Sequence, residues 1–344
     1  MNTPVSAGFL ALALVAPGLS ARAQSDATGP YHVARTFHVG GAGGWDYLTV
    51  DPAHRLLYVP RSTHTLVLSA DGGATVADIP GQNRNHGVAL VPAAGRGFIT
   101  DGEDACVVVF DLKSHAVLGK IRAQDDADGI IYDPSTNKVL LVCGDAGVLI
   151  PISPDIDPKT GSADPAIELG GKPEFLAADG RGRVYVNLVN KSEVAVVDVR
   201  AAKVLAHWPT APGGTPVGMA IDAAHRRLFI GCRNPQKLLV MDCDSGHILA
   251  ALPLGKGNDA VQFDAPYALA SCGDGTLTVA GERSPGQFDV VETLTTRVGA
   301  RTAGLDATTH TLFLPTAEME PSNGGRRPRP KPDSFMIVEV TRTR

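Results

Sequence analysis

The sequence predicts an all-β fold, a seven-bladed β-propeller in which every blade is a four-stranded antiparallel sheet. A short phrase, made of an apolar residue, an aspartate and a turn residue, recurs seven times before an apolar strand, with Val91 in place of the aspartate in the second copy. Its aspartate-equivalent positions lie 40, 42, 46, 43, 42 and 42 residues apart, which is the length of one propeller blade. The strands are rich in β-branched residues with alternating polarity, and Gly, Pro, Asn and Asp separate them.

Each repeat supplies the strands of one blade in order. The aspartate-equivalent positions are Asp51, Val91, Asp133, Asp179, Asp222, Asp264 and Asp306. The residues before each position form the innermost strand, and the apolar run after it forms the second strand. Third strands follow, as at residues 107–111 and 194–198, and a fourth follows at residues 117–121. We expect no long amphipathic helix.

The two ends of the chain complete the ring. The seventh repeat has its third strand at residues 335–340, and the chain stops before a fourth strand. Residues 31–40 have the pattern of a fourth strand with no blade before them. We therefore expect the N-terminal strand to complete the last blade, because an open ring would leave long unpaired strand edges.

The first 23 residues predict a signal peptide rather than part of the fold. Residues 7–15 are apolar, and the small-residue pattern of residues 21–23 fits a signal-peptidase site. The apolar run is too short to remain as a membrane anchor. We expect a periplasmic or secreted protein, with residues 24–344 as a single propeller domain, no membrane span in the mature chain and a monomeric state.

Composition excludes some functions. The 344 residues carry a formal net charge of -5 with both signs interspersed, so no basic surface suggests nucleic-acid binding. The five cysteines are odd in number and include no Cys-x-x-Cys pair. We expect them to be buried apolar residues rather than disulfides or a zinc site.

Several phrases carry a resemblance to a known family. They are Val-Tyr-Val-Asn at residues 184–187, the strand at residues 194–198 and Gly-Gly-Lys-Pro at residues 170–173. They resemble the YVTN-repeat, YncE-like family of bacterial exported propellers, over nearly the whole mature chain. The resemblance implies seven blades and export. It implies little about function, because members of that family mostly lack a defined reaction and a fold alone does not supply one.

Ionisable residues recur five positions before the aspartate-equivalent position, where the chain enters the innermost strand. The residues at this position are Asp46, His86, Asp128, Glu174, Val217, Asp259 and Arg301. Near-sevenfold symmetry would bring them together at one mouth of the central channel. Two interpretations stay open: a functional site, or a water-filled polar plug in which Arg301 pairs with Asp259 and Asp46.

As a functional site, this ring predicts specific chemistry. His86, Asp128, Glu174 and Asp259 are candidate ligands for a divalent ion: the carboxylates suit calcium or magnesium, and His86 also allows manganese, iron or zinc. The catalytic candidates are His86 as general base, Glu174, and Arg301 as a clamp for a carboxylate or phosphate. The candidates for ligand binding are Trp45, Asp46, Asn85 and Asp259. Trp45, Tyr47 and Phe175 form either an aromatic wall at the mouth or part of the core.

Three functions follow and remain open. The first is an exported propeller that binds a small ligand, a metal ion or a protein partner at the channel mouth without turnover. The second is a metal-dependent hydrolase or lyase that uses the ring. The third is a non-catalytic interaction scaffold in which the ring is a plug. The Pro- and Arg-rich loop 318–333 is expected on the same face as the ring, as a flexible flap, a partner-binding segment or a solvated loop.

Overall fold

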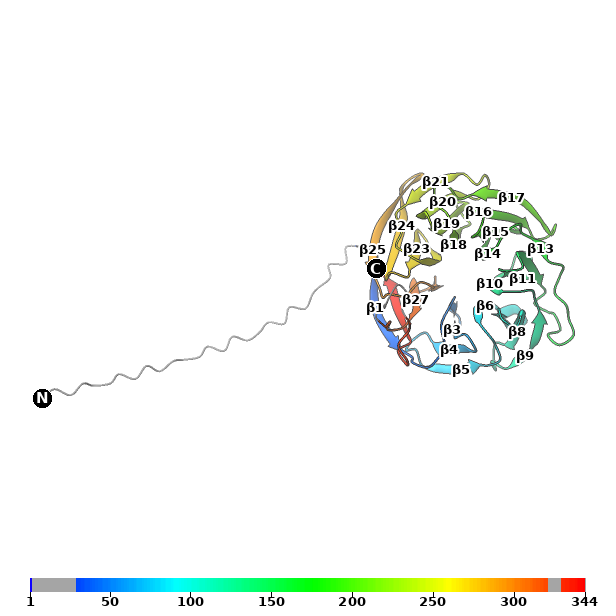
Figure 1. The fold of residues 1–344 in the computed structure, drawn as a ribbon, viewed down its shortest axis with the longest axis horizontal. Helices are drawn as coiled ribbons and strands as arrows, with labels where there is room; N and C mark the ends of the chain where they lie inside the picture. Colours follow the sequence, from blue (N-terminus) through cyan, green and yellow to red (C-terminus); the bar gives the residue numbers. More distant parts are fainter. Residues whose placement is uncertain (2–28, 321–328, 344) are drawn as a thin grey trace.

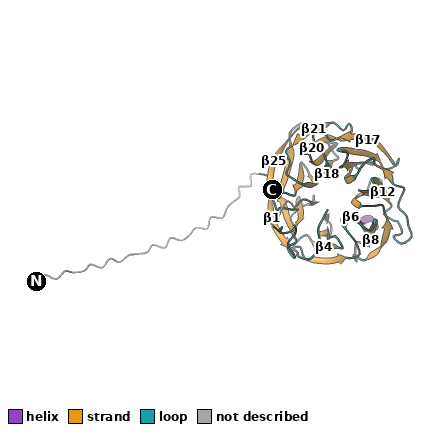
Figure 2. Cartoon of the chain, in the orientation of Figure 1, coloured by secondary structure: helices purple, strands orange, loops and turns teal. Residues whose placement is uncertain are grey.

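The structure, a computed structural model, describes Met1 and residues 29–320 and 329–343. These residues form seven four-stranded sheets arranged around a central axis, as Figure 1 shows. Figure 2 shows that strands and turns make up nearly all of the described chain, with one 3-10 turn, η1 (Pro92–Ala94). The predicted signal peptide and the loop tip at residues 321–328 lie outside the described residues.

The blades follow one another along the chain, and each runs from an inner to an outer strand. Blades one to four are β2 (Thr49–Asp51), β3 (Leu56–Pro60), β4 (Thr65–Ser69) and β5 (Thr75–Ile79); β6 (Asn85–Val91), β7 (Arg96–Asp101), β8 (Cys106–Asp111) and β9 (Val117–Arg122); β10 (Ala127–Asp133), β11 (Lys138–Cys143), β12 (Val148–Ile152) and β13 (Ile167–Glu168); and β14 (Pro173–Ala178), β15 (Arg183–Leu188), β16 (Glu193–Asp198) and β17 (Lys203–Pro209). Blades five to seven are β18 (Pro216–Asp222), β19 (Arg227–Arg233), β20 (Gln236–Asp242) and β21 (Ile248–Leu252); β22 (Asn258–Asp264), β23 (Tyr267–Cys272), β24 (Thr276–Ser284) and β25 (Gln287–Thr295); and β26 (Gly304–Asp306), β27 (Thr311–Thr316), β28 (Met336–Arg342) and β1 (Tyr31–His38).

The predicted closure of the ring is confirmed. The last sheet has the order β1-β28-β27-β26, and β1 pairs antiparallel with β28 from Tyr31 opposite Arg342 to His38 opposite Met336. The outer strand of blade seven is therefore supplied by the opposite end of the chain (Figure 1). This pairing covers an edge of β28 that would otherwise be open.

A buried arginine fixes the segment that leads from β1 into blade one. Arg61 is fully buried, and its guanidinium donates hydrogen bonds of 2.8–3.2 Å to the backbone carbonyl oxygens of residues 40–44. The guanidinium carbon also lies 3.7 Å from the ring centroid of Phe335. Burial lowers the pKa of Arg61 to about 10, so the group remains charged at neutral pH and its charge is balanced by carbonyl dipoles.

The core lies between neighbouring sheets, and glycines allow the inner strands to approach one another. A Cβ atom on Gly129 would lie 2.7 Å from the carbonyl oxygen of Glu174, and one on Gly218 would lie 2.8 Å from the backbone of Ala260. These glycines directly follow ring positions, and the lack of a side chain there allows the inner strands of neighbouring blades to pack closely.

All five cysteines are free and buried, as predicted. Burial raises the pKa of the thiols that lie in the strands and turns, which keeps them protonated and unreactive. Among the described residues, no helix has the length and apolar character needed to cross a membrane.

Candidate functional site

Six of the seven ring residues line a single pocket of about 600 Å³. These six come from six different blades: Asp46, His86, Asp128, Glu174, Asp259 and Arg301. Val217, the seventh, is fully buried and does not line the pocket. The shared register of the repeats therefore brings these side chains together as the sequence predicts.

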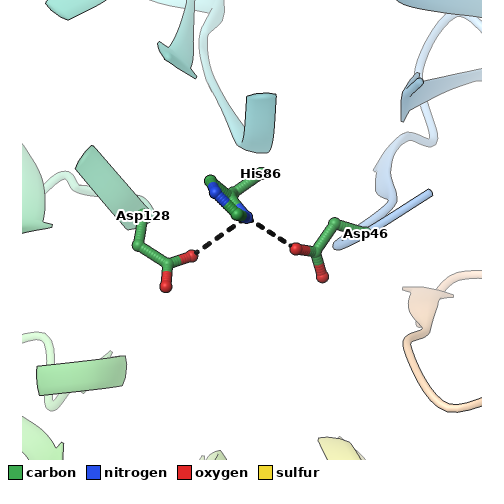
Figure 3. A group of neighbouring side chains, drawn as sticks. All are labelled: Asp46, His86 and Asp128. Atoms are coloured by element: carbon green, nitrogen blue, oxygen red, sulfur yellow. Dashed lines mark hydrogen bonds and ion pairs between the residues drawn. The ribbon is translucent and has the colours of Figure 1, made fainter. Parts of the chain in front are cut away.

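One side of the pocket holds His86 between two carboxylates, as Figure 3 shows. Its Nδ1 lies 2.7 Å from Oδ2 of Asp46 and 3.6 Å from Oδ1 of Asp128. Burial alone would lower the pKa of His86, but the hydrogen bond to Asp46 and the charges of Asp128 and Asp46 outweigh it and raise the pKa to about 9. At neutral pH, His86 is therefore a cation whose Nδ1–H donates a hydrogen bond to Asp46.

Burial affects both the other ring nitrogen of His86 and the carboxyl group of Asp128. The Nε2 atom of His86 is buried and has no hydrogen-bond partner within the described residues. Burial, together with the charges of Asp46 and Glu174, raises the pKa of Asp128 well above its usual value despite the opposing charge of His86. Only the Nδ1 side of His86 faces the neighbouring carboxylates.

Two arginines share one carboxylate on the opposite side of the pocket. Asp259 accepts hydrogen bonds from Nη2 of Arg233 and from Nε of Arg301. The Asp259 side chain is 7% exposed, whereas the arginine side chains are 36% and 40% exposed. The plug interpretation predicted that Arg301 pairs with Asp259 and Asp46; the pair with Asp259 is present, whereas no ion pair joins Arg301 to Asp46 in the described residues. Arg233, which enters from the end of β19 in the one blade whose ring position is apolar, was not predicted.

A second layer of charges lies two residues before three of the ring positions. Arg84 Nη2 lies 2.7 Å from Oδ1 of Asp126, and Lys172 Nζ lies 3.3 Å from Oδ2 of Asp126 and 2.6 Å from Oδ1 of Asp145. Arg84, Asp126 and Lys172 all line the same pocket. Sequence reasoning missed them, although a comparison of the repeats two positions earlier in the same register would have found them.

These additional residues balance the charges of the pocket lining. The described lining has five carboxyl groups, at Asp46, Asp126, Asp128, Glu174 and Asp259. It has five basic groups, at Arg84, His86, Lys172, Arg233 and Arg301. Most of these carboxyl groups are paired with cations.

Glu174 is the exception in this pocket. Its carboxyl group makes no hydrogen bond or ion pair within the part of the chain that the structure describes. Burial raises its pKa to about 7, the charges of Asp259 and Asp46 also raise it, and Arg233 and Lys172 only partly oppose this. Glu174 is therefore close to half protonated at neutral pH.

Two aromatic rings separate this pocket from the rest of the channel. The rings of Tyr47 and Phe175 lie 4.7 Å apart between centroids, and the Tyr47 hydroxyl donates to the carbonyl oxygen of Asp259 over 3.3 Å. Tyr47 lines the charged pocket and also a second cavity of about 360 Å³ that Phe175 and apolar residues such as Leu48 line. Tyr47 is therefore shared by the charged pocket and the more apolar cavity.

Two residues expected to bind ligand lie outside the pocket. Trp45 belongs to a hydrophobic core cluster and packs against Phe335, with ring centroids 5.8 Å apart. Asn85 is buried, and its amide donates to the carbonyl oxygen of His64, to Oγ1 of Thr65 and to Oε1 of Gln82. Trp45 packs the core and Asn85 holds the turn before β6, while Asp46 and Asp259 line the pocket.

The long loop of blade seven reaches the mouth of the pocket. Met319 lines the pocket and forms a β-bridge with Pro330. The amide of Glu320 donates to the carbonyl oxygen of Arg329 over 2.8 Å. The loop therefore lies on the face of the ring, as expected, whereas the flap prediction for its tip at residues 321–328 falls outside the described residues.

No known family model matches this sequence, and no curated protein matches it. Among solved structures, a chain from a structure described as hydrazine synthase of Kuenenia stuttgartiensis is similar, with a TM-score of 0.69 and 12% identity over 80% of this chain and 94% of that chain. A chain from a crystal structure of the mitotic checkpoint complex has a TM-score of 0.73 and 12% identity over 98% of this chain and 100% of that chain. At this identity the likeness establishes the fold alone, a seven-bladed β-propeller, an architecture that commonly mediates ligand or protein binding.

Proposed function

We propose that this protein is an exported, monomeric propeller of YncE-like type that binds a small polar ligand in the charged pocket at the channel mouth, without turnover. The observation that carries the proposal is the convergence of ionisable side chains from six blades on one pocket of about 600 Å³. Small-molecule sites are concave, of this general size, and carry a few convergent polar groups. The ring of Tyr47, which packs on Phe175, lines this pocket, and its volume suits a small molecule.

The polar groups in the pocket are more numerous than a plug would need. A plug requires that the charges satisfy one another, as Asp259 and its two arginines do. Glu174 lacks such a partner within the described residues, and burial raises its pKa to about 7. An unpaired, partly buried carboxyl group in a pocket is a feature of binding and catalytic sites.

A ligand screen on residues 24–344 tests this proposal. Thermal unfolding is followed against a library of polar metabolites, for the wild-type chain, for the double variant Glu174→Gln/Arg301→Gln and for Arg283→Gln. Arg283 pairs with Asp289 outside the pocket and serves as a control. At least one compound is expected to raise the melting temperature of the wild type and of the control but not of the double variant. If no compound separates these proteins, the ring is a plug and the proposal fails.

One observation favours a second candidate, a metal-dependent hydrolase or lyase. The ligating atoms of Asp46, His86 and Asp128 all lie within 4.8 Å of one another. Two carboxylates and one imidazole suit manganese, zinc or iron, and carboxylates with water suit magnesium or calcium. This set includes Asp46, whereas the expected ligands Glu174 and Asp259 do not belong to it. A divalent ion held there would polarise a substrate carbonyl or activate a water molecule.

Metal analysis separates the two candidates. A metal must displace the proton on Nδ1 of His86, so its affinity should rise as the pH increases toward about 9. Titration with Mn²⁺ at pH 6.5 and pH 8.5 is compared for the wild type, Asp128→Asn and Arg283→Gln. Saturable binding that strengthens with pH and is lost only in Asp128→Asn supports the enzyme candidate. Binding that is absent, or unchanged by Asp128→Asn, refutes the metal site.

A further inference from the structure

The charged pocket is electrically two-sided. On the side of blades five to seven, the cations Arg233 and Arg301 share the single carboxylate Asp259, which leaves one excess positive charge. On the side of blades one to three, the single cation His86 lies between two carboxyl groups, Asp46 and Asp128, and burial raises the pKa of Asp128 well above its usual value. Cations therefore outnumber carboxyl groups on one wall, whereas carboxyl groups outnumber cations on the other, and a cation bound there would favour ionisation of Asp128.

The positive wall has hydrogen-bond donors to spare. Arg233 uses Nε for the carbonyl oxygen of Asn258 and Nη2 for Asp259, and Arg301 uses Nε for Asp259. Within the described residues, Nη1 of Arg233 and both Nη atoms of Arg301 make no hydrogen bond. Two guanidinium groups fixed by a buried carboxylate, with free donors and partial exposure, suit a carboxylate or another oxyanion.

The negative wall has acceptors to spare. Within the described residues, Oδ2 of Asp128 and both carboxyl oxygens of Glu174 have no hydrogen-bond or ion-pair partner. Glu174 comes from the blade between the two walls, and the charges that act on it most are those of Asp259 and Arg233 on one wall and of Asp46 on the other. The nearby cations Arg84 and Lys172 are already occupied, because they pair with Asp126 and Asp145. An ammonium group requires only such oxygen acceptors, and unlike a metal ion it does not require His86 to lose its proton.

We propose that the ligand is a small zwitterion, with a carboxylate or similar oxyanion on Arg233 and Arg301 and an ammonium group on Glu174 and Asp128. This inference rests on the proposed function of the same pocket. A zwitterion meets the free guanidinium donors of one wall and the free carboxyl acceptors of the other, whereas a simple anion or a simple amine meets only one of the two. Arg233, from a strand end that lies outside the ring register, sets the specificity for the anionic end.

The test uses ω-amino acids of increasing length, from glycine to 6-aminohexanoate, in isothermal titration calorimetry with residues 24–344. The matched controls are hexanoate and hexylamine, each of which lacks one of the two charges. At least one zwitterion should bind, and the affinity of each singly charged compound should be lower by a factor of about ten or more. Arg233→Gln and Glu174→Gln should each weaken zwitterion binding by about tenfold or more, and Arg283→Gln should not.

Proton release provides a second readout. An ammonium group beside Glu174 stabilises the carboxylate, so binding at pH 7 should release a fraction of a proton from a group whose pKa is about 7. Titrations in two buffers of different ionisation enthalpy measure this release, and Glu174→Gln should reduce it, whereas Arg283→Gln should not. If Arg233→Gln fails to fold, Arg233→Lys supplies the comparison, because it keeps the charge but loses the planar pair of donors.

The outcomes distinguish this inference from the proposed function. Equal binding of the singly charged compounds, or zwitterion binding that survives Arg233→Gln, overturns the inference. Failure of every ω-amino acid, while the metabolite library yields another ligand of the pocket, also overturns it and leaves the proposed function standing. Failure of both the ω-amino acids and the library overturns both.

Discussion

The unpaired carboxyl group of Glu174 should make the propeller less stable as the pH rises toward neutrality. Burial raises the pKa of this group in the folded chain to about 7, from a usual value of 4.5. Between these two values the folded chain holds a proton that the unfolded chain releases, so the free energy of unfolding falls as the pH rises through this window. The difference between the two pKa values corresponds to about 3 kcal/mol.

The substitution Glu174→Gln isolates this effect, because glutamine keeps the size of the side chain and removes its charge. At pH 4 the two proteins should have free energies of unfolding within about 0.5 kcal/mol, since Glu174 is protonated in the folded chain. At pH 8 the variant should be more stable than the wild type by about 3 kcal/mol. Urea unfolding in the presence of a chelator, followed by tryptophan fluorescence at both pH values, provides the measurement.

Asp289→Asn serves as the matched control, because Asp289 is exposed and lies outside the pocket. Its pH profile should follow that of the wild type. Identical pH profiles for the wild type and Glu174→Gln would refute the reasoning. A wild type that is more stable than the variant at pH 8 would show that the ionised carboxylate has a stabilising partner, which contradicts the description of Glu174 as unpaired.

Three further predictions concern stability. The pKa of His86 is about 9 in the folded chain and 6.5 usually, so the protonated imidazole should stabilise the fold relative to His86→Gln below pH 6.5. This stabilisation should be lost as the pH rises through 9, which lowers the free energy of unfolding by about 3 kcal/mol in urea unfolding. A difference between the two proteins that does not change with pH would contradict this prediction. Arg61→Met should lower the free energy of unfolding by about 3 kcal/mol, because residues 40–44 lose the donor for their carbonyl oxygens; calorimetry that shows an unchanged melting temperature would exclude this role. A chain without residues 29–38 should form oligomers, detected by size-exclusion chromatography, because β28 then has an open edge that can pair with another chain. If the shortened chain remains a monomer with the stability of the wild type, β1 is not needed to close the ring.

The sequence by itself determined the architecture of this protein. Seven repeats of nearly constant length specify seven blades, and a missing fourth strand at one end with an extra strand at the other specifies how the ring closes. It also determined that Asp46, His86, Asp128 and Glu174 meet at one mouth of the channel. These features were predictable because a repeat places the backbone of each copy equivalently around the axis.

Only the tertiary structure decided which charges pair and which stay free. Arg233 enters the pocket from the end of the second strand of blade five, outside the ring register, and donates a hydrogen bond to Asp259. Glu174 has no hydrogen-bond or ion-pair partner in the described chain, and burial raises its pKa. Trp45 and Asn85 are neighbours of ring residues in sequence, yet both turn away into the core. The physical reason is that a repeat fixes where a residue stands, whereas the direction and partner of its side chain depend on contacts with other blades that differ from copy to copy.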